Sequence, residues 1–101
     1  MTLSLTSKQR KTLRGLAHGL PPLVLVGKAG VTDELVVQVD RALEAHELIK
    51  VRFLIGKDDK AAAALEIVRR TGAAEVGRIG HVSILYRPHP DPGKRRIELP
   101  R

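Results

Sequence analysis

A short apolar run that leads directly into a glycine turn and a helix start constrains this fold most. Residues 23–26 are Leu, Val, Leu and Val, and a four-residue turn separates them from Thr32, a favourable helix N-cap. Because the run is apolar without alternation, we expect a buried central strand. The turn consists of Gly27, Lys28, Ala29 and Gly30. The sequence therefore predicts a strand, a small cationic turn and a helix in immediate succession.

The turn itself has the composition of an anion-binding loop. Glycine lacks a Cβ and tolerates positive φ, so a bulky ligand can approach the backbone closely. Free N–H groups at a helix start favour anions, and Lys28 adds a point charge. Asp33 and Glu34 suit the helix dipole but repel an anion on the helix axis, so we expect a phosphate to approach from the side. The alternative is an ordinary strand-to-helix turn that merely needs glycine.

A second strand is predicted from alternation. Residues 48–55 alternate apolar and polar side chains, as a half-buried strand does. Lys50 and Arg52 then share one face of the sheet. The apolar side chains expected on the other face are those of Ile49, Val51, Phe53 and Ile55.

Three stretches have the apolar spacing and the capping residues of helices: residues 6–18, 32–46 and 59–70. We expect Asp58 or Asp59 to cap the third helix and Leu65 to belong to its packing face. Acidic side chains are expected on the exposed side of the second helix, namely Asp40, Glu44 and Glu47.

The remaining pattern completes one small domain. Residues 74–79 and 82–87 read as two short strands, and Gly80 with His81 forms the hairpin turn between them. The predicted order is α-β-α-β-α-β-β, a single-domain α/β sandwich with a four-stranded mixed sheet. We expect this domain to span residues 1–101, with a mobile basic tail at residues 89–101.

Composition excludes several classes of protein. The chain has 101 residues, no cysteine and four scattered histidines, so we expect no disulfide, no thiolate nucleophile and no metal site. No paired carboxylates or nucleophile–base pair support an enzyme, and no cofactor or small-molecule substrate is expected. We also expect no signal peptide, no membrane span and a cytoplasmic location.

The net charge of +7 points to a nucleic acid, because binding to phosphates releases counterions. The first helix carries a basic face with Lys8, Arg10, Lys11 and Arg14, for which the alternative interpretation is solvated surface charge. We expect this face and the Lys28 turn to form one anion-binding surface. Three cations elsewhere in the chain are further candidates for RNA contact, namely Lys50, Arg52 and Arg87. For the tail cations Lys94, Arg95 and Arg96, a solubilising role is the alternative.

Aromatic side chains are too few for base stacking. Phe53 and Tyr86 are the only two, and Phe53 is expected in the core. Modules that read single strands stack bases on several exposed rings. We therefore expect recognition of structured RNA through shape and phosphate contacts.

Several motifs in order resemble the CRM family, specifically its single-domain bacterial YhbY-like members. They are residues 13–18, Pro22 with the strand into residues 27–30, residues 42–51, Gly72 with Ala73, Ile79 with Gly80, and residues 85–88. Pro21 departs from the pattern, since relatives often carry a basic residue there.

The resemblance implies a fold similar to the C-terminal domain of translation initiation factor three. It also implies RNA binding, with residues 27–30 in contact with RNA, and association with precursors of the large ribosomal subunit. Ribosomal proteins are further expected partners. The alternative is a protein-interaction module that uses the acidic second helix.

Overall fold

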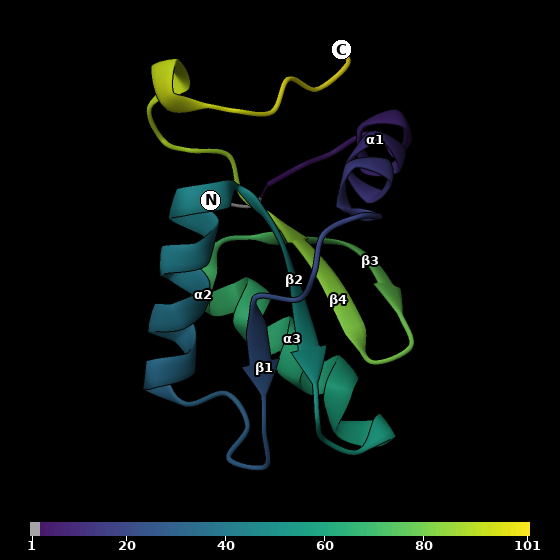
Figure 1. Cartoon of the computed structure of the whole chain (residues 1–101), viewed down its shortest axis with the longest axis vertical. Helices are drawn as coiled ribbons and strands as arrows, with labels where there is room; N and C mark the ends of the chain where they lie inside the picture. Colours follow the sequence, from purple (N-terminus) through teal and green to yellow (C-terminus); the bar gives the residue numbers. More distant parts are fainter. Residues whose placement is uncertain (1–2) are drawn as a thin grey trace.

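The computed structural model describes residues 3–101, apart from the side chains of Lys57 and Asp58. Its elements follow the predicted order (Figure 1). They are α1 (Ser7–Ala17), β1 (Val24–Val26), α2 (Asp33–His46), β2 (Leu48–Phe53), α3 (Lys57–Thr71), β3 (Ala74–Ile79), β4 (Val82–Tyr86) and the 3-10 turn η1 (Pro92–Lys94).

The four strands form one mixed sheet in the order β1-β2-β4-β3. β1 pairs with β2 in parallel, while β4 is antiparallel to both β2 and β3. Gly80, with φ of 58°, turns the β3–β4 hairpin. The predicted α/β architecture and mixed sheet are confirmed.

The prediction of a central position for β1 is wrong, because β1 is an edge strand. Val24 and Val26 are buried under the helices, but Leu25 points to the other face of the sheet and is 56% exposed. The uniformly apolar residues of β1 are therefore not buried on both faces of the sheet. The helix that could cover Leu25 lies at the other end of that face.

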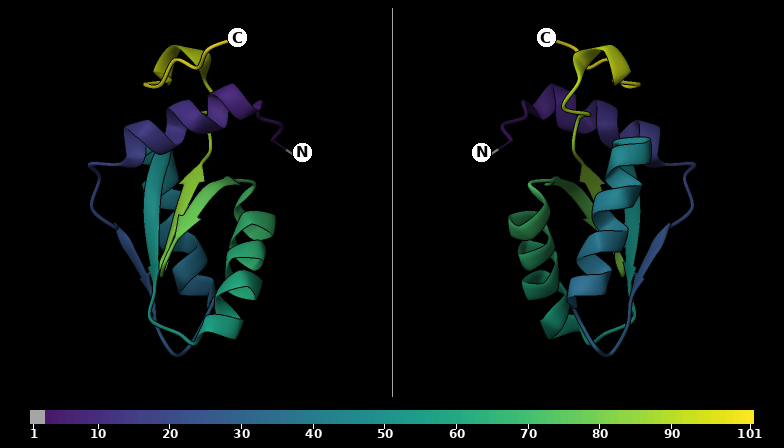
Figure 2. Two further views of the ribbon diagram at one scale, coloured as in Figure 1. Left: turned by 90° about the vertical axis from the view of Figure 1, so that its right-hand side faces the viewer. Right: turned by 90° about the vertical axis from the view of Figure 1, so that its left-hand side faces the viewer.

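The sheet separates two layers of unequal extent (Figure 2). α2 and α3 cover one face, and their core includes Leu43, Ile67 and Phe53. α1 crosses only one end of the opposite face, where Leu13 and Ala17 pack on the sheet. The rest of that face is open, with Lys50 and Arg52 of β2 on it, as the alternation predicted.

Two of the three helix starts follow the predicted chemistry. Thr6 and Gln9 form a reciprocal capping box on α1, and Thr32 caps α2. α3 instead begins after Gly56 without a side-chain cap, so the expected Asp cap is wrong; the helix starts earlier, and Asp59 lies within its first turn. Leu65 is 68% exposed rather than packed, whereas Ala64 and Ile67 of the same turn are buried.

Glu47 ends α2 and is buried, which contradicts the prediction of an exposed carboxylate. Its φ is 64°, and it is 1% exposed. The carboxylate accepts hydrogen bonds from three backbone N–H groups of the C-terminal segment, those of His89, Arg96 and Ile97. A helical pattern cannot indicate this burial, because the covering segment lies more than forty residues away in sequence.

The C-terminal segment, residues 89–101, runs over α1 rather than away from the domain (Figure 1). Ile97 and Leu99 pack against the cluster around Leu13, and Gln9 Nε2 donates to the Pro100 carbonyl at 2.9 Å. The mobility expected from its composition stays a prediction, against which these contacts argue. Across residues 3–101, none of the helices is both long and apolar enough to cross a membrane.

Candidate nucleic-acid interface

The glycine turn is a tight backbone loop at the carboxyl end of β1. The Gly30 N–H donates to the Gly27 carbonyl at 2.9 Å, and Gly30 adopts a φ of 74°. The Thr32 N–H then donates to the Gly30 carbonyl at 3.1 Å, and the Thr32 hydroxyl caps α2. The turn is thus held between a strand end and a capped helix, which fixes the direction of Lys28.

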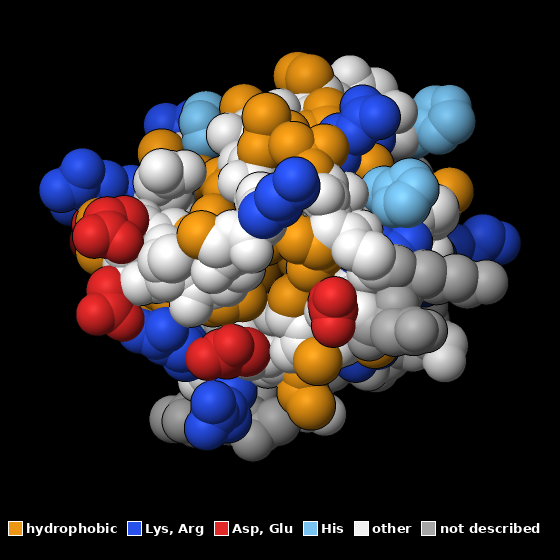
Figure 3. All heavy atoms as spheres, turned by 90° about the horizontal axis from the view of Figure 1, so that it is seen from below, with side chains coloured by type: hydrophobic (Ala, Val, Ile, Leu, Met, Phe, Trp, Pro, Cys, Tyr) orange, Lys and Arg blue, Asp and Glu red, His pale blue; other side chains and the backbone are white. Residues whose placement is uncertain are grey.

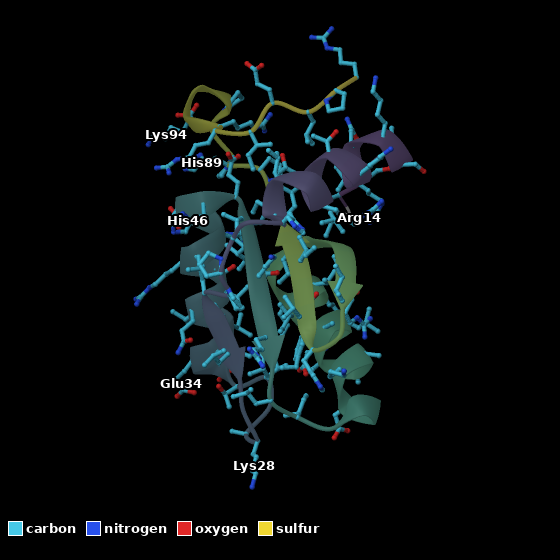
Figure 4. The ribbon with its side chains drawn as sticks, turned by 45° about the vertical axis from the view of Figure 1, so that its right-hand side comes forward. Arg14, Lys28, Glu34, His46, His89 and Lys94 are labelled. Atoms are coloured by element: carbon cyan, nitrogen blue, oxygen red, sulfur yellow. The ribbon has the colours of Figure 1, made fainter. Side chains whose placement is uncertain are left out.

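Lys28 is exposed and points away from the body at the tip of the turn (Figure 4). No hydrogen bond within residues 3–101 uses the backbone N–H of Lys28 or of Ala29. The turn therefore presents one ammonium group and two free amide donors to solvent. That combination matches a phosphate oxygen, which accepts from both kinds of donor.

The acidic residues beside the turn are partly neutralised. Arg70 of α3 forms an ion pair with Asp33 at 2.7 Å. Glu34 lies on the flank of α2, set back from the tip where Lys28 projects (Figure 4). Seen from below, the end face mixes Lys and Arg, acidic and hydrophobic side chains (Figure 3). Lys28 is thus a single protruding charge rather than part of a broad basic patch.

The fold constrains the two glycines of the turn differently. Gly30 occupies the left-handed region, which strains any residue with a Cβ. Gly27 does not, and a Cβ added there would meet no other atom within 4 Å. The fold therefore needs Gly30 but leaves the space above Gly27 open.

The basic face of α1 divides into two groups. Lys8 and Lys11 are exposed. Arg10 and Arg14 instead donate to backbone carbonyls of β3, at 2.9 Å to Glu75 and 3.0 Å to Val76. These two arginines fasten α1 to the sheet, a role that the charge pattern did not predict. RNA contact by Arg14 stays a prediction.

The structure does not bring the turn and the basic helix together. Figure 4 shows Lys28 at one tip of a molecule whose longest extent is 38 Å, whereas Arg14 lies in the other half, beside β3. The expectation of one continuous anion-binding surface is wrong. The physical reason lies in the topology, because α1 packs on the end of the sheet opposite to the end where β1 enters the turn.

Lys50 and Arg52 lie between these two ends, on the open face of the sheet. Lys50 Nζ donates to the His18 carbonyl at 3.3 Å. The side chain of Arg52 is exposed and makes no hydrogen bond to the described part of the chain. Together with five neighbours they line a groove of about 390 Å³. The neighbours are His18, Pro22, Ile79, Val82 and Ile84.

Arg87 has a structural role that sequence analysis missed. Its Nη1 donates to Asp40 Oδ1 and to the Thr71 carbonyl, both at 2.7 Å, and its Nη2 donates to the Asp40 carbonyl. Arg87 thus joins the end of β4 to α2 and α3. These bonds occupy most of its donors on the protein itself, and its RNA contact stays a prediction.

The acidic side of α2 is largely engaged within the fold. Asp33 and Asp40 pair with arginines, and Glu47 is buried under the tail. Glu34 and Glu44 remain as exposed carboxylates. A basic partner would therefore meet a much weaker acidic surface than the sequence indicates.

Tyr86 is a buried titratable residue beside Glu47. Burial raises the pKa of the Tyr86 phenol, the nearby Glu47 carboxylate raises it further, and Arg95 lowers it. Within residues 3–101, no group of three or more His, Asp or Glu side chains could hold a metal ion. What the site offers chemically is cationic and amide donors for an anion.

Comparison with known proteins gives matches over almost the whole chain. A family model described as the CRS1 / YhbY (CRM) domain matches residues 5–87. An RNA-binding protein of Haemophilus influenzae is 41% identical over 99 residues, which cover 97% of each chain. The probable RNA-binding protein YqeI of Bacillus subtilis is 41% identical over 97 residues, covering 95% of this chain and 99% of YqeI.

A solved structure has the same fold. The solution structure of the hypothetical protein SAV1595 from Staphylococcus aureus superposes with a TM-score of 0.81 at 38% identity. The match covers 96% of this chain and all of that one.

Proposed function

Because the chain belongs to the CRS1/YhbY (CRM) domain family, we propose that it is a non-catalytic RNA-binding protein. We further propose that it docks on structured ribosomal RNA of the large-subunit precursor and assists maturation of that particle in the cytoplasm. The observation that carries the proposal is the near full-length similarity to relatives described as RNA-binding proteins. The ribosomal target is the one that the family resemblance implies.

The turn at residues 27–30 supplies the first contact in this proposal. Lys28 places a positive charge near a phosphate, and the amides of Lys28 and Ala29 donate to its oxygens. The open space above Gly27 lets the RNA backbone come close. The Arg70–Asp33 ion pair lowers the repulsion that a phosphate would meet at the start of α2.

Both aromatic side chains of the protein are buried, which supports recognition of RNA by shape. Phe53 is 1% exposed and Tyr86 is 3% exposed, and the chain has no other Phe, Tyr or Trp. No exposed Phe, Tyr or Trp ring is then available to stack an unpaired base. We infer that the protein binds folded RNA through its phosphates, with little base specificity.

The alternative, a protein-interaction module on ribosomal particles that uses acidic α2, loses support. Three of the five acidic side chains in that region are engaged with the protein's own cations or amides. Pull-down after nuclease treatment separates the two readings. Partners lost with the RNA favour the RNA-binding role, whereas partners that persist favour the interaction module.

The test of the RNA contact compares two charge reversals of equal size. Lys28→Glu changes the turn, and Arg41→Glu changes an exposed position on α2. With a structured ribosomal RNA fragment, we expect Lys28→Glu to weaken binding about tenfold, as for loss of one charged hydrogen bond, and to lower the salt dependence by about one counterion. Arg41→Glu should have a much smaller effect. Equal effects of the two variants, with both folded, would refute the role of the turn.

A further inference from the structure

The net charge of the protein gathers at one end of the fold. Residues 1–20 carry four basic side chains and no acidic one, and residues 81–101 carry five basic against two acidic. These two segments therefore account for the whole net charge of +7. α1 and the C-terminal segment, which hold most of these charges, lie together at the end opposite to Lys28 (Figures 1, 2 and 4).

Six exposed side chains of α1 and the C-terminal segment make up what we call the cationic cap: Lys8, Lys11, Lys94, Arg95, Arg96 and Arg101. None of them takes part in the ion pairs found within residues 3–101, which are Arg70–Asp33, Arg78–Glu75 and Arg87–Asp40. Asp91 and Glu98 are the exposed acidic residues of the same segment, so the cap keeps an excess of positive charge.

A buried carboxylate holds the cap in place. Glu47 accepts from the His89 N–H at 2.8 Å through Oε2, and from Arg96 and Ile97 through Oε1. One side chain thus ties down both ends of the stretch that contains Lys94 and Arg95. The apolar side chains that follow, Ile97 and Leu99, pack inward against α1. A segment whose composition indicates a loose tail is thereby attached to the basic helix.

The cap and the turn are electrostatically independent. The molecule measures 38 × 24 × 24 Å, and the two lie at opposite ends of its long axis. Charges in solution are screened over about 8 Å at physiological ionic strength, far less than this separation. Because Lys28 points out of one end and the cap covers the other, an RNA segment bound at one of them leaves the other accessible.

We propose that the cationic cap is a second RNA-binding surface and that one protein chain bridges two RNA segments. The inference rests on the proposed function, since it takes the Lys28 turn as the first site. A phosphate backbone fits the cap better than a protein partner does. The cap offers cations without an exposed aromatic anchor, whereas the centre of a protein interface is apolar and rich in aromatics.

The experiment counts RNA molecules on a single chain. The 101-residue chain is mixed with a 12-base-pair RNA duplex at low salt, and native mass spectrometry gives the stoichiometry. We expect two duplexes on one monomer of the wild type. Lys28→Glu and the double variant Lys11→Glu/Lys94→Glu should each bind one. The control Arg41→Glu/Arg69→Glu makes the same change in charge at exposed positions on α2 and α3 and should still bind two.

A second readout tests bridging directly. One duplex is fixed to beads and the other carries a fluorophore, so retained fluorescence requires a chain that holds both. The wild type and the control Arg41→Glu/Arg69→Glu should retain the fluorescent duplex. Lys28→Glu and Lys11→Glu/Lys94→Glu should each fail to retain it.

The outcomes separate the inference from the proposed function. If the double variant still binds two duplexes, the cap is not an RNA site, and the result with Lys28→Glu alone decides the turn assignment. If the wild type binds one duplex that only Lys28→Glu removes, the cap is not an RNA site and the turn assignment stands. If Lys28→Glu has no effect while the double variant loses one duplex, the turn assignment fails and the cap remains. If the cap binds a polyglutamate peptide but no duplex, it is a protein-binding surface and the inference is overturned. Absence of any RNA binding overturns both.

Discussion

The side chain of Arg14 fills the space beside Gly77, so that a Cβ on this glycine would stand 2.9 Å from Arg14 Cδ. The guanidinium then donates to the Val76 carbonyl at 3.0 Å. Gly77 lies in β3 where the pairing with β4 shifts register. The glycine is therefore required by packing, because α1 reaches the sheet through this arginine.

Gly77→Ala should destabilise the protein by about 1–2 kcal/mol, since the added methyl overpacks the contact and displaces Arg14. Gly15→Ala is the matched control, because Gly15 lies in α1 and a Cβ there meets nothing within 4 Å. That control should be neutral or stabilising by up to about 1 kcal/mol. Urea unfolding measures both. The double variant Gly77→Ala/Arg14→Ala should show a smaller penalty than the sum of the single variants, and strict additivity would contradict the contact.

Glu47→Gln should loosen the C-terminal segment. The glutamine side chain has one acceptor oxygen where the carboxylate has two. Its amide group therefore faces either the His89 N–H or the N–H groups of Arg96 and Ile97, depending on which oxygen it replaces. We expect a loss of about 1–3 kcal/mol in the free energy of unfolding, the cost of leaving buried donors unpaired. Glu44→Gln, at an exposed position of the same helix, is the control and should have little effect.

Hydrogen exchange reports the same contact residue by residue. In the wild type the Arg96 and Ile97 amides should exchange slowly, and Glu47→Gln should speed up these two before the amides of α2. If the Arg96 and Ile97 amides of the wild type exchange as fast as amides in an unfolded chain, the result would instead support the mobile tail expected from composition.

Local patterns predicted the elements well because their causes are local. The alternation in residues 48–55 placed Lys50 and Arg52 on the face opposite to Ile49, since side chains in a strand alternate by geometry alone. Thr32 as an N-cap and Gly72 at the end of α3 also depend only on a few neighbouring residues.

The errors concern relations between distant segments. Nothing near β1 in sequence indicates that it lies at the edge of the sheet, because strand order depends on β2, β3 and β4. From the sequence alone Arg87 is expected to be a surface charge, because its partners, Asp40 and the Thr71 carbonyl, come close to it only in the folded protein. The separation of Lys28 from the basic helix has the same origin, since charge counts along a chain carry no information about which end of the sheet each segment reaches.

The alkaline behaviour of the protein should depend on Tyr86. Burial raises its pKa above the ordinary value of 10.0, with Glu47 adding to the shift. The unfolded chain then ionises first, so the contribution of this phenol to stability is constant well below pH 10 and falls as pH rises through and above that value. Tyr86→Phe should remove this fall, as thermal unfolding between pH 9 and 11 would show. Because the chain has one tyrosine, its ultraviolet titration reads the phenol directly, and a midpoint at or below 10.0 would contradict the burial effect.

Replacing each glycine of the turn by alanine should distinguish an effect on stability from an effect on RNA binding. Gly30→Ala forces a side chain into the left-handed region and should cost about 1–2 kcal/mol of stability. Gly27→Ala meets no protein atom within 4 Å and has no such backbone demand, so the melting temperature should hardly change. If a phosphate approaches over Gly27, the methyl group should nevertheless weaken RNA binding several-fold, while Gly15→Ala leaves it unchanged. Wild-type affinity of Gly27→Ala would mean that RNA does not come close at this position, and that Lys28 acts from a distance as a charge alone.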